Sequence, residues 1–273
     1  MKAFSNVTWV LEEEVFADSN KQLRDAVMEA GADVIRWKDP WIADESWPRL
    51  SGKKVIFHGS LNNAAKVADS LPWQPGAYCD TEKFHCSRWY LRAKPWLLQQ
   101  HWTISTVKDL VSHPNEVLGR IGSPESVFVR PDSPHKPFSG RVASHDDLVQ
   151  LLWTMDSAAT TTGRIVVSRV CPIQKNGGVV VAGEVVAGST YQADGRKALG
   201  DDADGRPWQF AANLAKLMEL PQEVCVMDVC ESEGNLHLLE LNPFSGADLY
   251  SCNRLAVVQA VSTFAANHVP PKS

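Results

Sequence analysis

The stretch LHLLELNPFSGADLY, residues 236–250, decides the fold. It begins as an apolar strand, places Glu240 and Asn242 two positions apart, and turns at once through a Pro, Ser and Gly-containing segment, residues 243–246. Because successive side chains point to opposite faces of a strand, Glu240 and Asn242 share one face. Two oxygen-bearing side chains are therefore predicted where one strand face ends.

The preceding run, EVCVMDVCESEGN (residues 223–235), predicts an antiparallel partner strand. Reflecting the chain about the centre of the turn places Asp228 opposite Glu240, with residues 233–235 as a three-residue hairpin loop. A bulge would shift this pairing by one residue. Asp228, Glu240 and Asn242 then offer three hard oxygen ligands, the kind that Mg²⁺ prefers. The alternative is that all three are solvent-facing polar residues of an antiparallel sheet.

A second stretch, SVFVRPDSPHKPFSGRV (residues 126–142), carries two cations. An apolar strand leads to Arg130, and a Pro and Ser-rich loop then carries Lys136. A guanidinium can bind phosphate oxygens in a bidentate way, while a lysine supplies a point charge. The pattern therefore indicates a phosphate-binding loop, and the alternative is a surface loop with ordinary solvated charges.

Taken in order, RPDSPHKPFSG, IVVSRV, GEVVAGSTY and VMDVCESEGNLHLLELNPFSGADLY resemble the ATP-grasp superfamily. The resemblance covers about residues 81–265 and is to the clade in which an arginine replaces the usual phosphate-binding lysine. It implies an α+β fold in which two α+β lobes surround a nucleotide cleft, preceded by a small α/β pre-ATP-grasp domain. The expected domains are residues 1–78 and residues 79–273.

The resemblance also implies roles for the charged residues. Arg130 and Lys136 are expected to bind the phosphates of ATP and to serve catalysis there. Asp228, Glu240 and Asn242 are expected to coordinate the Mg²⁺ that bridges those phosphates. ATP and Mg²⁺ are thus the expected cofactors.

The adenine side of the expected site lies in the hinge between the lobes. By the resemblance, the backbone of Ser168, Arg169 and Val170 meets adenine. Glu184, and Ser189 to Tyr191, fall on a predicted strand next to this hinge and are further candidates for contact with the nucleotide or substrate.

One departure from the family pattern concerns the substrate. Relatives in this clade commonly carry a Glu-aromatic-Arg triplet before the strand GVVVAG, whereas this chain has Lys175, Asn176 and Gly177 near that place. If the missing arginine binds an acyl phosphate or a substrate carboxylate, Lys175, Arg169 or a residue of the first domain must replace it. Otherwise the activity is abolished or redirected.

The resemblance implies an ATP-dependent carboxylate-amine or carboxylate-thiol ligase that activates a carboxylate as an acylphosphate and forms ADP and phosphate. Its partners are a small-molecule or peptide carboxylate and an amine. Two alternatives stay open: an ATP-binding regulatory or interaction protein without turnover, and a small-molecule kinase. The sequence contains no G-x-S-x-G, H-E-x-x-H or G-x-x-x-x-G-K-[ST] motif, which agrees with chemistry that needs no side-chain nucleophile.

Bulk properties exclude other classes. A formal net charge of −5 and a pI near 5.9 give no electrostatic footprint for nucleic acid. No run approaches the roughly 18 apolar residues of a membrane span, and the six cysteines form no C-x-x-C pair. We expect a cytoplasmic protein without nucleic-acid or membrane partners. The sequence does not indicate the oligomeric state.

Local patterns predict the elements that carry these residues. Strands are expected over residues 7–11, 32–37 and 53–60, with His58 interpreted as a turn residue. Asp18 and Ser19 are expected to cap a helix that Gly31 closes. Further predictions concern the middle of the chain: a helix from near Thr81, a helix broken at Pro114, a strand over residues 126–131, and a helix over residues 144–155 capped by Ser144.

Overall fold

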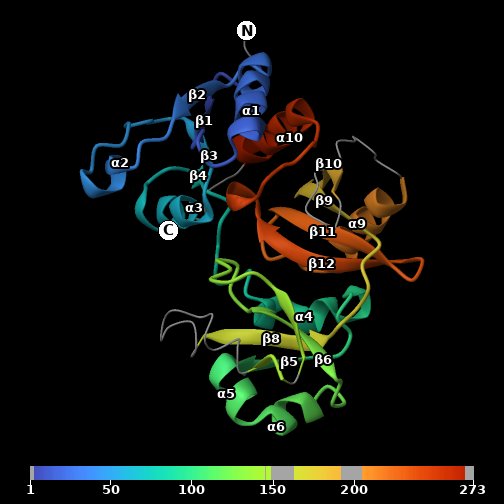
Figure 1. The fold of residues 1–273 in the computed structure, drawn as a ribbon. Helices are drawn as coiled ribbons and strands as arrows, with labels where there is room; N and C mark the ends of the chain where they lie inside the picture. The colour runs from blue at the N-terminus through green and yellow to red at the C-terminus, as the bar shows by residue number, and fades with distance from the viewer. Residues whose placement is uncertain (1–2, 145, 149–162, 192–204, 268–273) are drawn as a thin grey trace. The chain divides into compact units, whose positions relative to one another are not determined.

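The chain forms two compact units in a computed structural model that describes residues 3–144, 146–148, 163–191 and 205–267 (Figure 1). The first unit comprises residues 1–80, 175–230 and 240–273. The second unit comprises residues 81–174 and 231–239. Along the chain, the first unit gives way to the second after Asp80. The expected domain boundary after residue 78 stays a prediction.

The first unit begins with a parallel sheet in the strand order β2-β1-β3-β4. Its strands are β1 (Val7–Leu11), β2 (Asp33–Arg36), β3 (Lys54–His58) and β4 (Pro75–Gly76). Its helices are α1 (Ala17–Glu29), α2 (Pro40–Ala43) and α3 (Leu61–Ser70). β1 is buried along its whole length and pairs in parallel with both β2 and β3, as expected for a strand between two crossover connections. The three predicted strands and the helix between the first two are confirmed, whereas the short helix α2 was not predicted.

The start of α1 differs from the prediction. The helix begins at Ala17, so Asp18 and Ser19 lie inside its first turn and do not cap it. Phe16 is the N-cap residue, with a non-helical φ of −125° and ψ of 60°. The end of α1 is as predicted, because Gly31 adopts the left-handed φ of +78° that ends many helices.

The first unit also contains a second sheet, in the order β10-β9-β11-β12. Its strands are β9 (Lys175–Ala182), β10 (Glu184–Tyr191), β11 (Val224–Ser232) and β12 (Asn235–Pro243). The helix α9 (Gly205–Leu217) stands between β10 and β11 in the chain, and the 3-10 turn η2 (Phe244–Gly246) and the helix α10 (Arg254–Asn267) follow β12. The tip of the β11-β12 hairpin, residues 231–239, groups with the second unit.

One apolar core joins the two ends of the chain within the first unit. It includes Trp9 of β1, Val226 of β11 and Val258 of α10, and α1 lies beside α10 (Figure 1). The fully buried Trp9 donates from Nε1 to Ser262 Oγ at 3.0 Å. A buried tryptophan with its N–H paired contributes to the core.

The second unit has an antiparallel sheet in the order β5-β8-β6-β7. Its strands are β5 (Trp102–Thr106), β6 (Ser126–Pro131), β7 (Arg141–Ser144) and β8 (Arg164–Arg169). Its helical elements are α4 (Cys86–Ala93), the 3-10 turn η1 (Lys94–Trp96), α5 (Val107–Ser112) and α6 (Pro114–Gly119). Mixed helices and sheets of this kind make the fold α+β.

Three predictions for the second unit have different outcomes. The helix broken at Pro114 is confirmed, because α5 ends at Ser112 and Pro114 opens α6. The helix expected from near Thr81 begins only at Cys86. Most of the helix expected over residues 144–155 lies outside the described residues. In the part of the chain that the structure describes, no helix is long and apolar enough to cross a membrane.

Candidate functional site

The first candidate cluster lies on β11 and β12 in the first unit. Asn242 donates from Nδ2 to Asp228 Oδ2 at 3.0 Å, so these two predicted ligands are in direct contact. Asp228 is buried, with 8% of its surface exposed. Glu240 and Asn242 are half-buried on the same strand, two residues apart.

The turn that joins these strands is shorter than predicted. β11 ends at Ser232 and β12 begins at Asn235, so the loop has two residues instead of three. Glu233 and Gly234 adopt φ values of +51° and +78°, the left-handed backbone that a two-residue hairpin turn favours. The expected loop of residues 233–235 is wrong in length, yet Asp228 and Asn242 still meet.

The pKa of Tyr250 shows which other side chains lie near this cluster. Burial raises the pKa of the Tyr250 hydroxyl to about 12, and the carboxylates of Asp228, Asp248 and Glu240 contribute to the rise. These three carboxylates therefore share one electrostatic environment with the phenol. Sequence reasoning missed Asp248 and Tyr250, although both lie within the stretch quoted at the outset.

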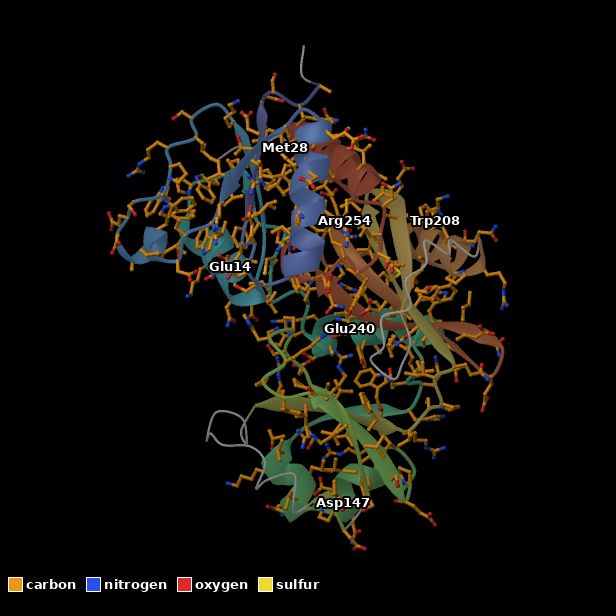
Figure 2. All side chains as sticks on the ribbon, turned by 45° about the horizontal axis from the view of Figure 1, so that its top comes forward. Glu14, Met28, Asp147, Trp208, Glu240 and Arg254 are labelled. Carbon is orange, nitrogen blue, oxygen red and sulfur yellow. The ribbon has the colours of Figure 1, made fainter. Side chains whose placement is uncertain are left out.

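A buried arginine at the start of α10 holds the loop that carries Tyr250. Arg254, labelled with Glu240 in Figure 2, is only 6% exposed. It donates to three loop carbonyl oxygens: those of Leu249 (2.9 Å), Tyr250 and Cys252 (2.7 Å). Ser189, a candidate from the sequence, accepts from the Ser251 amide at 3.1 Å and so supports the same loop.

The three candidate ligands fit a hard divalent cation by their chemistry. Two carboxylates and one amide supply oxygen donors, and Asn242 can offer Oδ1 while Nδ2 keeps its bond to Asp228. Among the described residues, no group of three or more His, Cys, Asp or Glu side chains is arranged to hold a metal. The cluster has only two such ligands together with an amide, a composition that a shared phosphate oxygen would complement.

The two candidate cations lie in the second unit, in different surroundings. Arg130, near the end of β6, is buried with 8% exposed, whereas Lys136 is exposed in the following loop with a φ of +47°. The alternative of a surface loop with solvated charges therefore does not hold for Arg130. The reason is that β6 is an inner strand, paired with β8 on one side and β7 on the other.

The hinge candidates occupy the end of β8 and the residue after it. Ser168 is fully buried, and its Oγ has no hydrogen-bond partner among the described residues. Arg169 and Val170 are exposed, but Arg169 donates from Nε to the Ile121 carbonyl at 2.8 Å. That contact gives the Arg169 side chain a structural role within the second unit.

Glu184 lies at the beginning of β10 in the first unit, next to the Gly183 turn. It is exposed and lines an open groove with residues of α10, among them Gln259 and Thr263. Its role toward a nucleotide stays a prediction.

The unusual segment Lys175–Gly177 opens β9. Gly177 pairs with Thr190 on β10, and a Cβ added at Gly177 would lie 2.7 Å from the Ser189 carbonyl oxygen. Real Cβ atoms do not approach backbone so closely, so β9 and β10 are packed too tightly here for a side chain. Glycine at position 177 is therefore required by this strand pairing, and the replacement of a family triplet by Lys175–Gly177 stays a prediction.

His58 at the end of β3 is a core residue. It is fully buried between the rings of Phe16 and Phe244, and its Nε2 lies 3.1 Å from the Ala247 carbonyl oxygen, to which it donates. Burial lowers the pKa of His58 from 6.5 to about 4. The ring is therefore neutral at pH 7, and the interpretation of His58 as a turn residue without a site role is refined to a buried core histidine.

We expect this histidine to make stability depend on pH. The unfolded chain takes up a proton near pH 6.5, while folded His58 does not until about pH 4, so the free energy of unfolding falls as the pH drops through this window. The loss amounts to about 3 kcal/mol by linkage. Urea unfolding at pH 7 and pH 4.5 should show it, and His58→Gln should flatten the slope. His113→Gln, at an exposed histidine, should leave the slope unchanged.

Comparison with known proteins shows the family to which the chain belongs. Residues 101–260, more than half of the chain, match the family described as "ATP-grasp domain, R2K clade family 2". The chain belongs to the ATP-grasp superfamily, so the resemblance to that superfamily is confirmed, while the arginine in place of the usual phosphate-binding lysine stays a prediction. A search of curated proteins finds no match.

Solved structures share the fold at low sequence identity. A RimK domain ATP-grasp protein from Sphaerobacter thermophilus has a TM-score of 0.63 and 12% identity, over 95% of this chain and 100% of that one. The D-cycloserine synthetase DcsG has a TM-score of 0.63 and 15% identity, over 94% and 99%. A D-alanine–D-alanine ligase from Bacillus anthracis, complexed with ATP, has a TM-score of 0.58 and 11% identity, over 96% and 99%.

Proposed function

We propose that this protein is an ATP-dependent carboxylate-amine or carboxylate-thiol ligase. The observation that carries the proposal is the Asp228–Asn242 contact, with Glu240 on the same strand, in a chain that belongs to the ATP-grasp superfamily. The synthetase and ligase names of its structural neighbours support this reaction class. Cytoplasmic location and a small-molecule or peptide substrate pair stay part of the proposal.

The protein's own groups would act by positioning and by neutralising charge. Arg130 and Lys136 bind the phosphates, the backbone around Ser168 to Val170 receives adenine, and Asp228, Glu240 and Asn242 hold Mg²⁺. When bound, Mg²⁺ would offset negative charge on the phosphates. The γ-phosphoryl group passes to the substrate carboxylate, giving an acylphosphate and ADP. The amine or thiol then attacks the carbonyl carbon and releases phosphate.

The deciding experiment measures ADP release from Mg·ATP in the presence and absence of a mixture of small acids and amines. Product mass then separates condensation from simple phosphorylation. ATP binding with no ADP formed under any mixture would instead favour a regulatory protein, the alternative that the Lys175–Gly177 segment motivates. A phosphorylated product without condensation would favour a kinase.

Replacing Lys136 by Met should weaken ATP binding by about tenfold or more, because a charge-assisted hydrogen bond to phosphate is lost. The apo protein should unfold at nearly the same temperature, since Lys136 is exposed and surface substitutions change stability by about 0.5 kcal/mol or less.

Lys108→Met, at an exposed position of α5, is the matched control and should change neither quantity. Calorimetric titration with Mg·ATP and an apo thermal scan give both numbers. An unchanged ATP affinity in the Lys136 variant would remove this residue from the site.

A further inference from the structure

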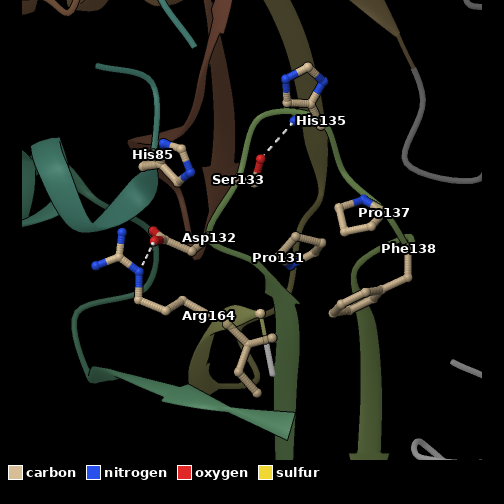
Figure 3. A pocket seen from close by; sticks show the side chains of 10 residues that line it. His85, Pro131, Asp132, Ser133, His135, Pro137, Phe138 and Arg164 are labelled. Carbon is tan, nitrogen blue, oxygen red and sulfur yellow. Dashed lines mark hydrogen bonds and ion pairs between the residues drawn. The ribbon is translucent and has the colours of Figure 1, made fainter. Parts of the chain in front are cut away.

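The second unit contains a cavity of about 390 Å³ between the start of α4, the loop after β6 and the start of β8. Figure 3 shows it with two kinds of lining. Polar groups of His85, Asp132 and Arg164 form one part, and the rings of Pro137 and Phe138 form another. None of the roles proposed so far uses this cavity.

Asp132 is fully engaged in the fold. It is 1% exposed, and its carboxylate accepts from the Ser87 amide at 2.6 Å and the Ser87 hydroxyl at 2.8 Å. It also forms an ion pair with Arg164, whose Nε lies 3.1 Å from Oδ2, so two hydrogen bonds and one opposite charge compensate this buried carboxylate. Asp132 therefore anchors α4 and orients Arg164, and it does not make the cavity a cation site.

Arg164 is the group that can receive a ligand. Its side chain is 54% exposed, and among the described residues its ion pair with Asp132 uses only Nε. A guanidinium held through Nε presents its two terminal nitrogens as a fork that matches a carboxylate. The ion pair thus holds Nε of Arg164 beside Asp132 before any ligand binds.

The remaining lining favours a ligand with an apolar body. Pro131 and Ile165 are buried, and Phe138 is partly buried against the core of the second unit. The guanidinium of Arg141 lies over the Phe138 ring, 5.9 Å from its centroid. Such a wall suits an aliphatic chain or a flat ring better than it suits a phosphate group.

The cavity is also distinct from the candidate phosphate ligands. Arg130 and Lys136 flank the loop that forms it, but neither is among the described residues that line it. A ligand in the cavity would therefore lie close in sequence to both phosphate-binding candidates without using either. An acid substrate and the nucleotide that activates it need separate binding groups of this kind.

We propose that this cavity binds the acid substrate, and that the substrate is a small carboxylate with an apolar body, held by the terminal nitrogens of Arg164 and packed against Phe138 and Pro137. The assignment to the acid substrate rests on the proposed ligase function. The binding of a small carboxylate in the cavity does not depend on that function. Carboxylate binding and ligase function can therefore be contradicted separately.

The test uses benzoate as the probe, with benzamide as its neutral counterpart, in calorimetric titrations of the whole protein. Benzoate should bind the wild type, and Arg164→Gln should weaken it by about tenfold or more, since charge-assisted hydrogen bonds are lost. Arg164→Lys keeps a charge beside Asp132 but loses the fork, and it should also bind benzoate weakly. Arg120→Gln, at an exposed arginine of the same unit, should behave as the wild type.

A second titration tests whether the cavity binds a carboxylate or the phosphate of a nucleotide. Saturating Mg·ATP should leave benzoate affinity unchanged or improved. Displacement of benzoate by ATP or by inorganic phosphate would assign the cavity to the nucleotide and overturn the proposal. So would equal binding of benzamide, no binding of benzoate to the wild type, or full benzoate affinity in both Arg164 variants. Benzoate binding without any ATP binding would contradict only the ligase function.

Discussion

Replacing Glu240 by Gln should reduce the stabilisation that Mg·ATP confers on this protein by about 1.4 kcal/mol. The substitution keeps the shape of the side chain and removes one negative charge from the candidate metal ligands. Because ligand stabilisation follows RT ln(1 + [L]/Kd), a tenfold weaker complex loses about 1.4 kcal/mol at saturating ligand. The measurement is a pair of thermal shifts, with and without Mg·ATP, for the wild type and the variant.

The apo protein carries the second half of this prediction. Asp228 and Glu240 lie on the neighbouring strands β11 and β12, and two carboxylates gathered around one metal site repel one another when no cation is bound. Removing the charge of Glu240 should leave apo stability unchanged or slightly higher. Glu233→Gln, at the exposed hairpin turn of the same strands, should alter neither shift. Lower apo stability with an unchanged Mg·ATP shift would make Glu240 a structural residue.

Sequence reasoning found the parts of this protein in which local pattern and tertiary structure agree. β6 has the predicted bounds, because apolar alternation ends at Arg130 and Pro131. The strands around Gly183 and the hairpin at Gly234 turn at glycines, which accept left-handed backbone. The motif RPDSPHKPFSG and the ending with Asp228, Glu240 and Asn242 carried the resemblance to the ATP-grasp superfamily.

Properties that depend on neighbouring strands were not predictable in this way. The burial of Arg130 follows from the inner position of β6, which no single segment reveals. α1 begins at Ala17, with Phe16 at the N-cap position, although cap preferences alone favour Asp18 and Ser19.

Residues that act through distant partners were also missed. Asp132 stands in the quoted phosphate-loop motif, yet its role depends on Ser87 and Arg164, which lie far from it in the sequence, one on either side. Asp248 and Tyr250 lie on a loop that Arg254 holds by hydrogen bonds to its carbonyl groups, and there the carboxylates of Asp228 and Glu240 act on Tyr250. A strand pattern does not encode the contact between Arg254 and this loop.

Asp228→Asn should lower the rate of ADP formation by about a hundredfold, the effect typical of losing one preorganised group that stabilises a developing charge. The substituted amide would retain an oxygen that can accept from Asn242, so the 3.0 Å contact and the apo fold should persist. Because Asp228 is buried, the loss of its negative charge is the main change that this substitution makes.

Combining Asp228→Asn with Glu240→Gln tests whether the two carboxylates act through one cation. If they do, the first substitution already removes most of the metal, and the second costs much less than it does alone. If each stabilises the fold or the nucleotide separately, the two effects multiply. The cycle is measured as ADP formation at saturating Mg·ATP, with Glu240→Gln and Glu233→Gln as the control pair. Multiplicative losses in the first cycle would contradict a shared Mg²⁺, and strong coupling in the control pair would show that the cycle reports general damage instead.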